Sequence, residues 1–415
     1  MGLPTLEEFT AEADVWLAAH APARVEGRAA AWGEGSDDVS VFHNLSFEEE
    51  AALLEANMAW QREKFDGGWG AITWPTEAGG KGLPSAYGHA FAQAEARYET
   101  PKPHEAFSVT LHLVAPTIAA YGTPEQQATL IPPLLRTEHL ACQLFSEPGA
   151  GSDLAGLSTR AERDGDGWVV NGQKVWSSGA GHAAWGELIC RTDPDLPKHA
   201  GLSAFLLAMD TPGVEVRPIR QMNGGSSFYE VFLTDVRVSD AQRLGPVGEG
   251  WKVALTTLGF ERGGAGDGDS RCGGSWSQLL ALARWLGRDA DPLVRQDLAR
   301  VYTDQRLQQL TGARVTATTE AGQPPGAEGS IGKLLWTLGM TRISDVSSRL
   351  LGARLTADSG EWGTFAWNQH VLGAPGYRIA GGSDEVQRNI LAERVLGLPP
   401  EPRVDKDVPW KDVPR

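Results

Sequence analysis

Two acids stand near the C-terminus in a setting that could support chemistry. Residues 379–389 read IAGGSDEVQRN, and Asp384 and Glu385 directly follow a glycine pair and Ser383. Carboxylates can act as general bases when they lie within reach of a proton. Serine, however, is a preferred N-cap, and acids in the first turn of a helix are stabilised by its macrodipole. We therefore interpret Asp384 as a structural residue and expect the reactive carboxylate elsewhere.

Glu261 is a better candidate for a general base. If GWKVALTTLGFERGG is a helix, then Trp251, Ala254, Leu258 and Glu261 follow one face at spacings of three, four and three. A carboxylate that extends an apolar stripe loses hydration, which raises its pKa and suits a base that works near neutral pH. The alternative is a structural ion pair with a neighbouring arginine.

Two further segments combine small residues with hydroxyl groups. In FSEPGAGSD, Gly149 and Gly151 let backbone N–H groups approach a ligand, and Ser146 and Ser152 add donors. In VWSSG, residues 175–179, a tryptophan followed by two hydroxyls could stack on a flat ring and hydrogen-bond to its edge. The alternatives are an ordinary loop between domains and a tryptophan packed at the end of a strand.

The elements that must position these residues follow the order helix, sheet, helix. The periodicity is helical at first, becomes β in the middle of the chain, and returns to helical afterwards. We predict domains at 1–138, 139–245 and 246–400, followed by a polar, proline-containing tail at 401–415. Since strands and helices do not alternate, a Rossmann fold is disfavoured.

Local signals mark several boundaries of these elements. A first helix is predicted to open at Thr5, and a second to run from Ser46 to a stop at Gly67. In the middle part, a GDG stretch and the pair Asn171-Gly172 are both hairpin signals.

The composition limits the possible partners and locations. The 415 residues carry 37 basic and 53 acidic side chains, a net charge of −16, which argues against nucleic acid or an anionic membrane surface. Cys142, Cys190 and Cys272 show no metal spacing, so we expect a reducing cytoplasm and no metal site. The N-terminus carries acids where a signal peptide carries positive charge, and no apolar run approaches about 18 residues, so no membrane span is expected.

Several long motifs, taken in order, resemble the acyl-CoA dehydrogenase family of flavoproteins. They are GGWGAITWPTEAGGKG, FSEPGAGSD, DGWVVNGQKVWSSG and GGSDEVQRNILAERVLG, and the resemblance runs over nearly the whole chain. It implies an α+β multidomain fold with an N-terminal helical domain, a middle β-sandwich or barrel domain and a C-terminal helical bundle. It also implies FAD, held between the β domain and the C-terminal bundle.

The same resemblance implies a set of contacts for the cofactor and the substrate. Ser146 would bond the pyrimidine edge of the flavin, Trp176 would lie beside the ring, and Ser178 would donate to N5, the hydride acceptor. Fixed donors there stabilise the charge that a flavin gains with the hydride. The implied cofactor contacts are Gln143, Phe145, Ser146, Gly151, Ser152, Trp176, Ser177, Ser178, Ser383 and Glu385. The implied substrate contacts are Ser152, near the phosphates of CoA, Arg262 and Gly382.

The sequence departs from much of the family at the catalytic base. Where those members carry a glutamate, this chain has Gly381, which cannot take a proton. A subset resembling the isovaleryl and long-chain types carries its base at the position of Glu261, followed by an arginine, here Arg262. The backbone N–H of Gly381 would still polarise the thioester carbonyl. Glu261 would take the pro-R α-proton while the β-hydrogen leaves as hydride to N5, giving a trans-2-enoyl thioester.

Other departures bear on partners and substrate. Many members carry a GRxxFG segment that reaches the FAD of a neighbouring subunit, and here the nearest match is Gly287-Arg288 without Phe-Gly. Some bacterial relatives pair two different chains, and similar sequences occur in sterol side-chain breakdown, so we expect a homo- or hetero-oligomer. The usual electron acceptor of the family is an electron-transfer flavoprotein. The glycine-rich residues 263–274 either widen the acyl pocket for a bulky or branched chain or form a surface-loop insertion.

Two other functions stay open on the same scaffold. One is a flavin-dependent monooxygenase that uses free reduced flavin and oxygen, a class that generally lacks the catalytic glutamate. The other is a catalytically silent subunit that stabilises an active partner.

Overall fold

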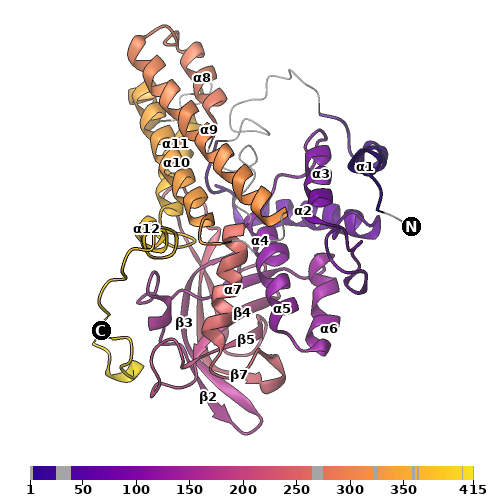
Figure 1. Ribbon diagram of the computed structural model, residues 1–415, viewed down its shortest axis with the longest axis vertical. Coiled ribbons are helices and arrows are strands. Elements are labelled where there is room, and N and C mark those ends of the chain that lie inside the picture. Colours follow the sequence, from indigo (N-terminus) through magenta and orange to yellow (C-terminus); the bar gives the residue numbers. More distant parts are fainter. Residues whose placement is uncertain are drawn as a thin grey trace.

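The computed structural model describes residues 3–24, 39–263, 274–320, 326–357, 360–361, 364–403 and 405–414. Within these ranges, the side chains of residues 261–263 and 319–320 are not described. A helical part, a sheet and a second helical part follow one another along the chain, with the C-terminal bundle rising from one end of the sheet (Figure 1). This order confirms the predicted fold class of helical, sheet and helical domains.

The first two helices begin where the sequence places their caps. The side chains of Thr5 and Ser46 each accept a hydrogen bond from the backbone N–H three residues later, and Glu8 and Glu49 reach back to complete two capping boxes. The second helix ends at Gly67, as predicted. The helical segments of this part are α1 (Leu6–His20), α2 (Phe47–Asp66), η2 (Thr76–Ala78), α3 (Ser85–Glu95), α4 (Glu105–Ser108), the π-helical η3 (Val109–Val114), α5 (Ala115–Tyr121) and α6 (Pro124–Leu135).

The middle part is a mixed sheet that the described residues build from eight strands. Along the sheet the order is β6-β7-β3-β2-β4-β5-β8, and β1 pairs with β4 in parallel. The strands are β1 (Ala141–Leu144), β2 (Arg160–Asp164), β3 (Gly167–Ser178), β4 (Trp185–Arg191), β5 (Leu202–Ala208), β6 (Val214–Ile219), β7 (Phe228–Ser239) and β8 (Arg243–Leu244).

One of the two predicted hairpin turns is wrong. The GDG stretch does turn between β2 and β3, where Asp164 pairs with Gly167. Asn171 and Gly172, however, lie inside β3, at a point where its pairing with β7 shifts register. A Cβ on Gly172 would meet Thr159 Oγ1 at 2.3 Å. The glycine there allows close packing within a strand rather than a turn.

The C-terminal part is built of helices around a core of its own, in which Trp367 is fully buried. Its first helix, α7, belongs instead to the core shared by the sheet and the N-terminal helices, where Val253 and Ala254 pack with Ile118 and Ile189. Helix α7 is therefore the junction of all three parts. The helices are α7 (Gly250–Gly263), α8 (Trp276–Trp285), α9 (Pro292–Glu320), α10 (Gly329–Leu351), α11 (Thr364–Tyr377), α12 (Asp384–Ile390) and the π-helical η7 (Leu391–Val395).

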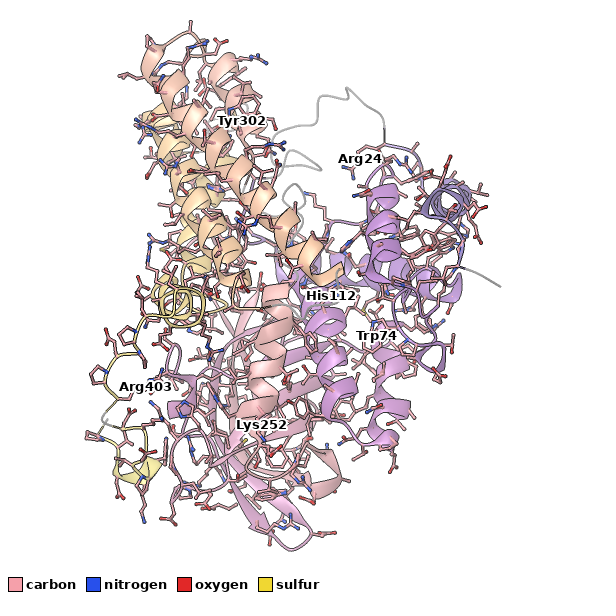
Figure 2. The ribbon with its side chains drawn as sticks, viewed as in Figure 1. Arg24, Trp74, His112, Lys252, Tyr302 and Arg403 are labelled. Atoms are coloured by element: carbon pink, nitrogen blue, oxygen red, sulfur yellow. The ribbon has the colours of Figure 1, made fainter. Side chains whose placement is uncertain are left out.

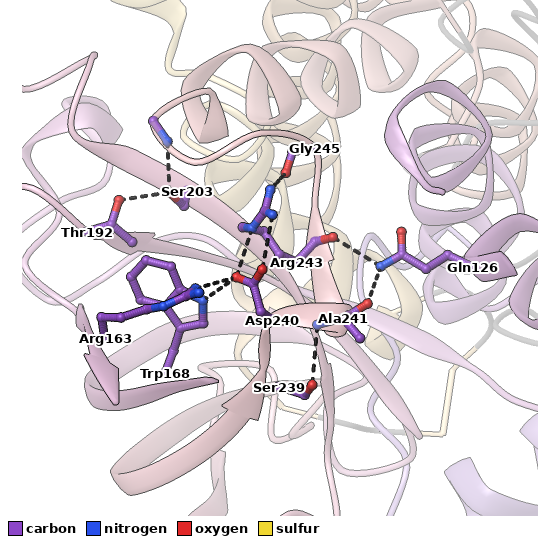
Figure 3. A network of polar contacts seen from close by, with 11 residues as sticks. Gln126, Arg163, Trp168, Thr192, Ser203, Ser239, Asp240, Ala241, Arg243 and Gly245 are labelled. Atoms are coloured by element: carbon purple, nitrogen blue, oxygen red, sulfur yellow. Dashed lines mark hydrogen bonds and ion pairs between the residues drawn. The ribbon is translucent and has the colours of Figure 1, made fainter. Parts of the chain in front are cut away.

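A polar network around Asp240 fastens the sheet to the N-terminal helices (Figure 3). The Asp240 carboxylate accepts hydrogen bonds from Arg243, Trp168 and Arg163, which lower its pKa. Gln126 of α6 donates to two backbone carbonyls of the same segment, at 2.8 and 3.0 Å. The network fixes the segment between β7 and β8 against helix α6.

The described part of the chain lacks a membrane-spanning helix and a metal-binding cluster, and its cysteines are not reactive. No helix there is long and apolar enough to cross a membrane. Those residues also include no group of three or more His, Cys, Asp or Glu side chains that could hold a metal ion. Cys142 and Cys190 are buried free thiols, and burial raises the pKa of each to about 12, so neither is a reactive thiolate.

Candidate active site

The FSEPGAGSD segment is held in place by a buried carboxylate, Glu147, which the sequence pattern did not single out. Its Oε2 accepts hydrogen bonds from Ser158 N at 2.7 Å and Ser158 Oγ at 2.9 Å. Its Oε1 accepts from Thr159 N at 2.8 Å and from Lys174 Nζ at 2.9 Å. Burial alone would raise the pKa of Glu147, but the Lys174 charge and these hydrogen bonds outweigh it and lower the pKa to about 2. Glu147 is therefore ionised and ties the segment to strand β3.

Two contacts bring this segment beside the VWSSG motif. Lys174 is fully buried, and its Nζ donates to the carbonyl of Phe145 at 3.0 Å. The backbone N–H of Val175 donates to the carbonyl of Ser146 at 2.9 Å. Ser146 and Trp176 therefore lie on neighbouring stretches of backbone, as a shared ligand requires. Farther along the segment, Ser152 is exposed.

Trp176 stands out from strand β3 because of a β-bulge. Lys174 and Ser177 are three residues apart on β3, whereas their partners on β7, Val231 and Tyr229, are only two residues apart. Trp176 takes a φ of 62°, a left-handed conformation that is rare for a bulky residue. Its side chain is 59% exposed, whereas Ser177 is buried and Ser178 is half-buried. An exposed ring on such a strained backbone is typical of a ligand-binding surface.

Helix α7 presents the face that the sequence predicts. Ala254 is buried, and Trp251 and Leu258 pack partly buried against the same core, which confirms three of the four positions in the apolar stripe. The fourth position, Glu261, lies in α7, but its side chain and that of Arg262 fall outside the described residues. Their catalytic and binding roles stay predictions, as does the role of the glycine-rich segment, whose residues 264–273 also fall outside.

A second carboxyl group, Glu187 of β4, lies beneath α7. Thr257, one helical turn before Glu261, donates from Oγ1 to Glu187 Oε1 at 2.6 Å, and the same hydroxyl is 2.9 Å from Thr117 Oγ1 of α5. Glu187 is 0% exposed and pairs in register with Gln143 of β1. Burial raises the pKa of Glu187 to about 8, against the opposing effect of the Thr257 hydrogen bond. Sequence periodicity gave no sign of this neutral acid, because its partners lie on other elements.

The GGSDEVQRN segment begins helix α12 as predicted. The Ser383 side chain caps the helix and accepts from the backbone N–H of Val386 at 3.3 Å. Asp384 is 1% exposed, and its carboxylate accepts from Arg378 Nε at 2.7 Å and from Thr337 Oγ1 at 2.9 Å. These contacts confirm that Asp384 is a structural residue.

The glycine pair before this helix has a fixed backbone. Gly381 and Gly382 take left-handed φ values of 66° and 87°, which favour glycine. Gln387 Nε2 donates to the carbonyl of Gly381 at 2.9 Å, and Lys333 Nζ donates to the carbonyl of Gly382 at 2.7 Å. The Glu385 side chain is 76% exposed, 3.6 Å from Arg388. The pair can therefore hold its peptide groups in one orientation, whereas Glu385 faces solvent.

An aromatic row connects Trp176 with the C-terminal bundle. The ring of Trp176 is perpendicular to that of Phe228 at 6.2 Å, and Phe228 contacts Phe42 at 5.2 Å. Phe42 in turn stacks on Tyr377 at 4.9 Å, and Tyr377 ends α11 shortly before Gly381. The row connects the VWSSG motif with the end of α11, from which the chain continues to the glycine pair. Phe42 was not predicted, because its partners are distant in the chain.

The described residues fit the flavin that the sequence resemblance implies. Gln143 Nε2 and Ser177 Oγ are buried and have no hydrogen-bond partner within the described part of the chain. A Cβ added at Gly149 or Gly151 would meet nothing within 4 Å, so the backbone there is open to a ligand. Unpaired polar groups together with an exposed indole ring suit a flat heterocycle with a polar edge.

Models of one protein family match the chain in three consecutive pieces. The N-terminal domain of acyl-CoA dehydrogenase matches residues 45–138, the middle domain matches residues 142–236, and the C-terminal domain matches residues 248–396.

Individual relatives cover nearly the full length. The chain is 38% identical to acyl-CoA dehydrogenase IpdE1 of Mycobacterium tuberculosis and 39% identical to the protein of that name from Mycolicibacterium smegmatis, each over 95% of this chain and 98% of the relative. Among solved structures, the Tcur3481-Tcur3483 steroid ACAD matches with a TM-score of 0.75 and the ChsE4-ChsE5 complex of M. tuberculosis with 0.72. Both are 28% identical and cover 97% of this chain and 99% of theirs. The chain therefore belongs to the acyl-CoA dehydrogenase family, whose members are FAD-dependent oxidoreductases that act on CH–CH bonds.

Proposed function

We propose that the protein oxidises an acyl-CoA thioester to its trans-2-enoyl form. The observation that carries the proposal is the hydrogen bond from Val175 N to the Ser146 carbonyl, at 2.9 Å. It sets the two motifs side by side and leaves the Trp176 ring 59% exposed next to them. Such a surface can hold a flat cofactor against a substrate.

Glu261 is the proposed catalytic base. Its helix packs its apolar face into the shared core, so a carboxylate on that face would be desolvated and suited to removing a proton near neutral pH. Gly381 is the proposed oxyanion donor, because its left-handed φ and the hydrogen bond that holds the following peptide restrict the direction in which its own N–H can point. Arg262 and Gly382 are proposed to contact the substrate, and Ser152 its CoA phosphates.

The cofactor contacts are proposed on the middle domain and at the start of α12. FAD supplies the hydride acceptor when it is bound. The orphaned Gln143 amide and the two hydroxyls after Trp176 would satisfy the polar edge of the ring, and Ser146 would bond it from the adjacent segment. The other proposed cofactor contacts are Phe145, Gly151, Ser152, Ser383 and Glu385.

The substrate and partners follow from the relatives. One similar structure is a steroid ACAD and another is a complex of two differently named chains, ChsE4 and ChsE5. We therefore propose a bulky, sterol-derived or branched acyl chain, an assembly with a second chain or a second copy, and an electron-transfer flavoprotein or a similar acceptor.

The test is anaerobic reduction of the FAD-loaded protein by a panel of acyl-CoA thioesters, followed by flavin absorbance. The wild-type flavin should bleach with at least one bulky or branched substrate. Glu261→Gln should still bind FAD but bleach about 10²–10⁴-fold more slowly, because a general base typically contributes that factor. The matched control is Glu12→Gln, which changes an exposed acid of α1 outside the proposed site and should keep the wild-type rate.

Other outcomes separate the competing functions. Equal bleaching rates for Glu261→Gln and the wild type would rule out Glu261 as the base. Oxygen-dependent hydroxylation retained by that variant would favour a monooxygenase. A purified protein without FAD that no acyl-CoA affects would favour a silent subunit.

A further inference from the structure

The C-terminal tail is docked on the sheet domain rather than loose. It covers residues 401–414, of which 404 is not described, and it lies beyond residue 396, where the family match ends. The backbone N–H of Trp410 donates to the carbonyl of Leu196 at 2.9 Å, and that of Lys411 donates to the carbonyl of Pro194 at 3.1 Å. In Figure 1 the tail descends from α12 along the sheet, and Figure 2 labels Arg403 on this stretch.

The tail reaches the turn of residues 149–156, called the Ser152 turn below, through the indole of Trp410. Its Nε1 donates to the carbonyl of Gly156 at 3.2 Å, and its ring lies 4.7 Å from the guanidinium carbon of Arg191. Arg191 itself donates to the carbonyl of Ala155 at 2.6 Å and to that of Lys198 at 2.7 Å. Trp410 thus covers the arginine that joins the turn to the loop after β4.

An ion-pair bridge makes a second connection to the same turn. Lys198 Nζ lies 3.0 Å from the carboxylate of Asp153 and 2.7 Å from that of Asp405 in the tail. The side chains of Lys198 and Asp405 are only 13% and 27% exposed, whereas that of Asp153 is 64% exposed, so the Lys198–Asp405 pair is the better shielded half of the bridge. Asp153 is the immediate neighbour of Ser152, so the tail is connected to this turn at two points, through Gly156 and through Asp153.

We propose that the tail is a clasp in which Asp405 and Trp410 position the Ser152 turn for the nucleotide end of the thioester substrate. This inference rests on the proposed function, in which Ser152 contacts CoA. The turn contains Gly149 and Gly151 and has an exposed Ser152, so it would lose conformational entropy on binding if nothing held it beforehand. The clasp removes that cost, and it does so without touching the reacting carbons.

Because the clasp contacts only the turn at the nucleotide end of the substrate, its loss should change substrate affinity and leave the turnover rate unchanged. The nucleotide end of CoA keeps its contacts from the bound substrate through the transition state. Interactions of this uniform kind lower KM without changing kcat. Loosening the clasp should therefore weaken binding of CoA and acyl-CoA, while an acyl-pantetheine, which lacks the nucleotide, should be unaffected.

The experiment compares Trp410→Ala and Asp405→Asn with the wild type, as FAD-loaded full-length proteins in the assembly that purifies. Free CoA is titrated by calorimetry, and KM and kcat are measured for one acyl-CoA and for the matching acyl-pantetheine. Both variants should bind CoA roughly 5–20-fold more weakly and raise the KM for acyl-CoA by a similar factor, with kcat within about twofold of wild type. Lys406→Ala is the matched control, since Lys406 is an exposed tail residue next to Asp405.

The other possible results distinguish a failure of the clasp from a failure of the proposed function. Unchanged CoA affinity in both variants, or an equal rise of KM for acyl-CoA and acyl-pantetheine, would overturn the clasp. A wild-type flavin that no acyl-CoA bleaches would instead overturn the proposed function. If Trp410→Ala loses FAD or unfolds, Asp405→Asn decides the test, because it keeps the size of the side chain.

Discussion

Glu187 is a carboxyl group without exposed surface, and its burial has a consequence for stability. Because burial raises the pKa of Glu187 to about 8, above its ordinary value of 4.5, the folded protein keeps this proton after the unfolded chain has lost it. The contribution of Glu187 to the free energy of unfolding is therefore full below about pH 4.5 and declines as the pH rises towards 8. Glu187→Gln, which keeps an acceptor for Thr257 and cannot ionise, should remove this decline.

The corresponding measurement compares thermal or urea unfolding of the wild type and Glu187→Gln at pH 5 and pH 8. The variant should gain on the wild type by up to about 3–4 kcal/mol between these two conditions, since each unit of pKa shift corresponds to about 1.4 kcal/mol. Glu385→Gln serves as the exposed control and should follow the wild type. Parallel pH profiles for the wild type and Glu187→Gln would show that Glu187 is ionised in the folded protein.

At the scale of elements, the Glu147–Lys174 pair decides how the FSEPGAGSD segment meets strand β3. Lys174→Met would leave the Glu147 carboxylate buried without its cation, and breaking a buried pair in this way costs about 3–5 kcal/mol. The variant should show a lower urea midpoint and weaker FAD binding. The double variant Glu147→Gln with Lys174→Met should recover much of the loss, because no unpaired charge remains. A double variant as unstable as Lys174→Met alone would contradict this account.

Local signals in the sequence predicted the elements better than the contacts between them. The caps at Thr5, Ser46 and Ser383 and the apolar face of α7 depend on residues a few positions apart, so periodicity and capping rules were sufficient. The Asn171-Gly172 turn failed because a glycine needed for close packing inside a strand looks the same as a turn residue in the sequence.

The candidate site shows the same division between local and long-range information. The positions of Trp176, Ser146 and Gly381 followed from motifs, whereas Glu187, Phe42 and the tail contacts join segments far apart in the chain. Only folding reveals such contacts, since no local spacing encodes them. The role of Glu261 stays a prediction, because its side chain lies outside the described residues.

At the scale of the whole molecule, helix α9 presents an apolar surface that suits a second chain. Leu307 and Leu310 are 50% and 52% exposed and lie three residues apart, on one side of the helix. Clustered exposed apolar side chains on a single helix face mark interaction sites more often than scattered ones do. We therefore expect α9 to lie in the interface of the proposed assembly with a second chain or a second copy.

Leu307→Glu combined with Leu310→Glu should dissociate that assembly, because two charges would have to be buried without partners. Light scattering should report the mass of a single chain for the double variant and a larger mass for the wild type. Val15→Glu, at a position of α1 that is 75% exposed, is the control and should leave the mass unchanged. If the double variant has the mass of a single chain, its FAD content shows whether the site is complete within one chain. An unchanged mass in the double variant would place the interface elsewhere.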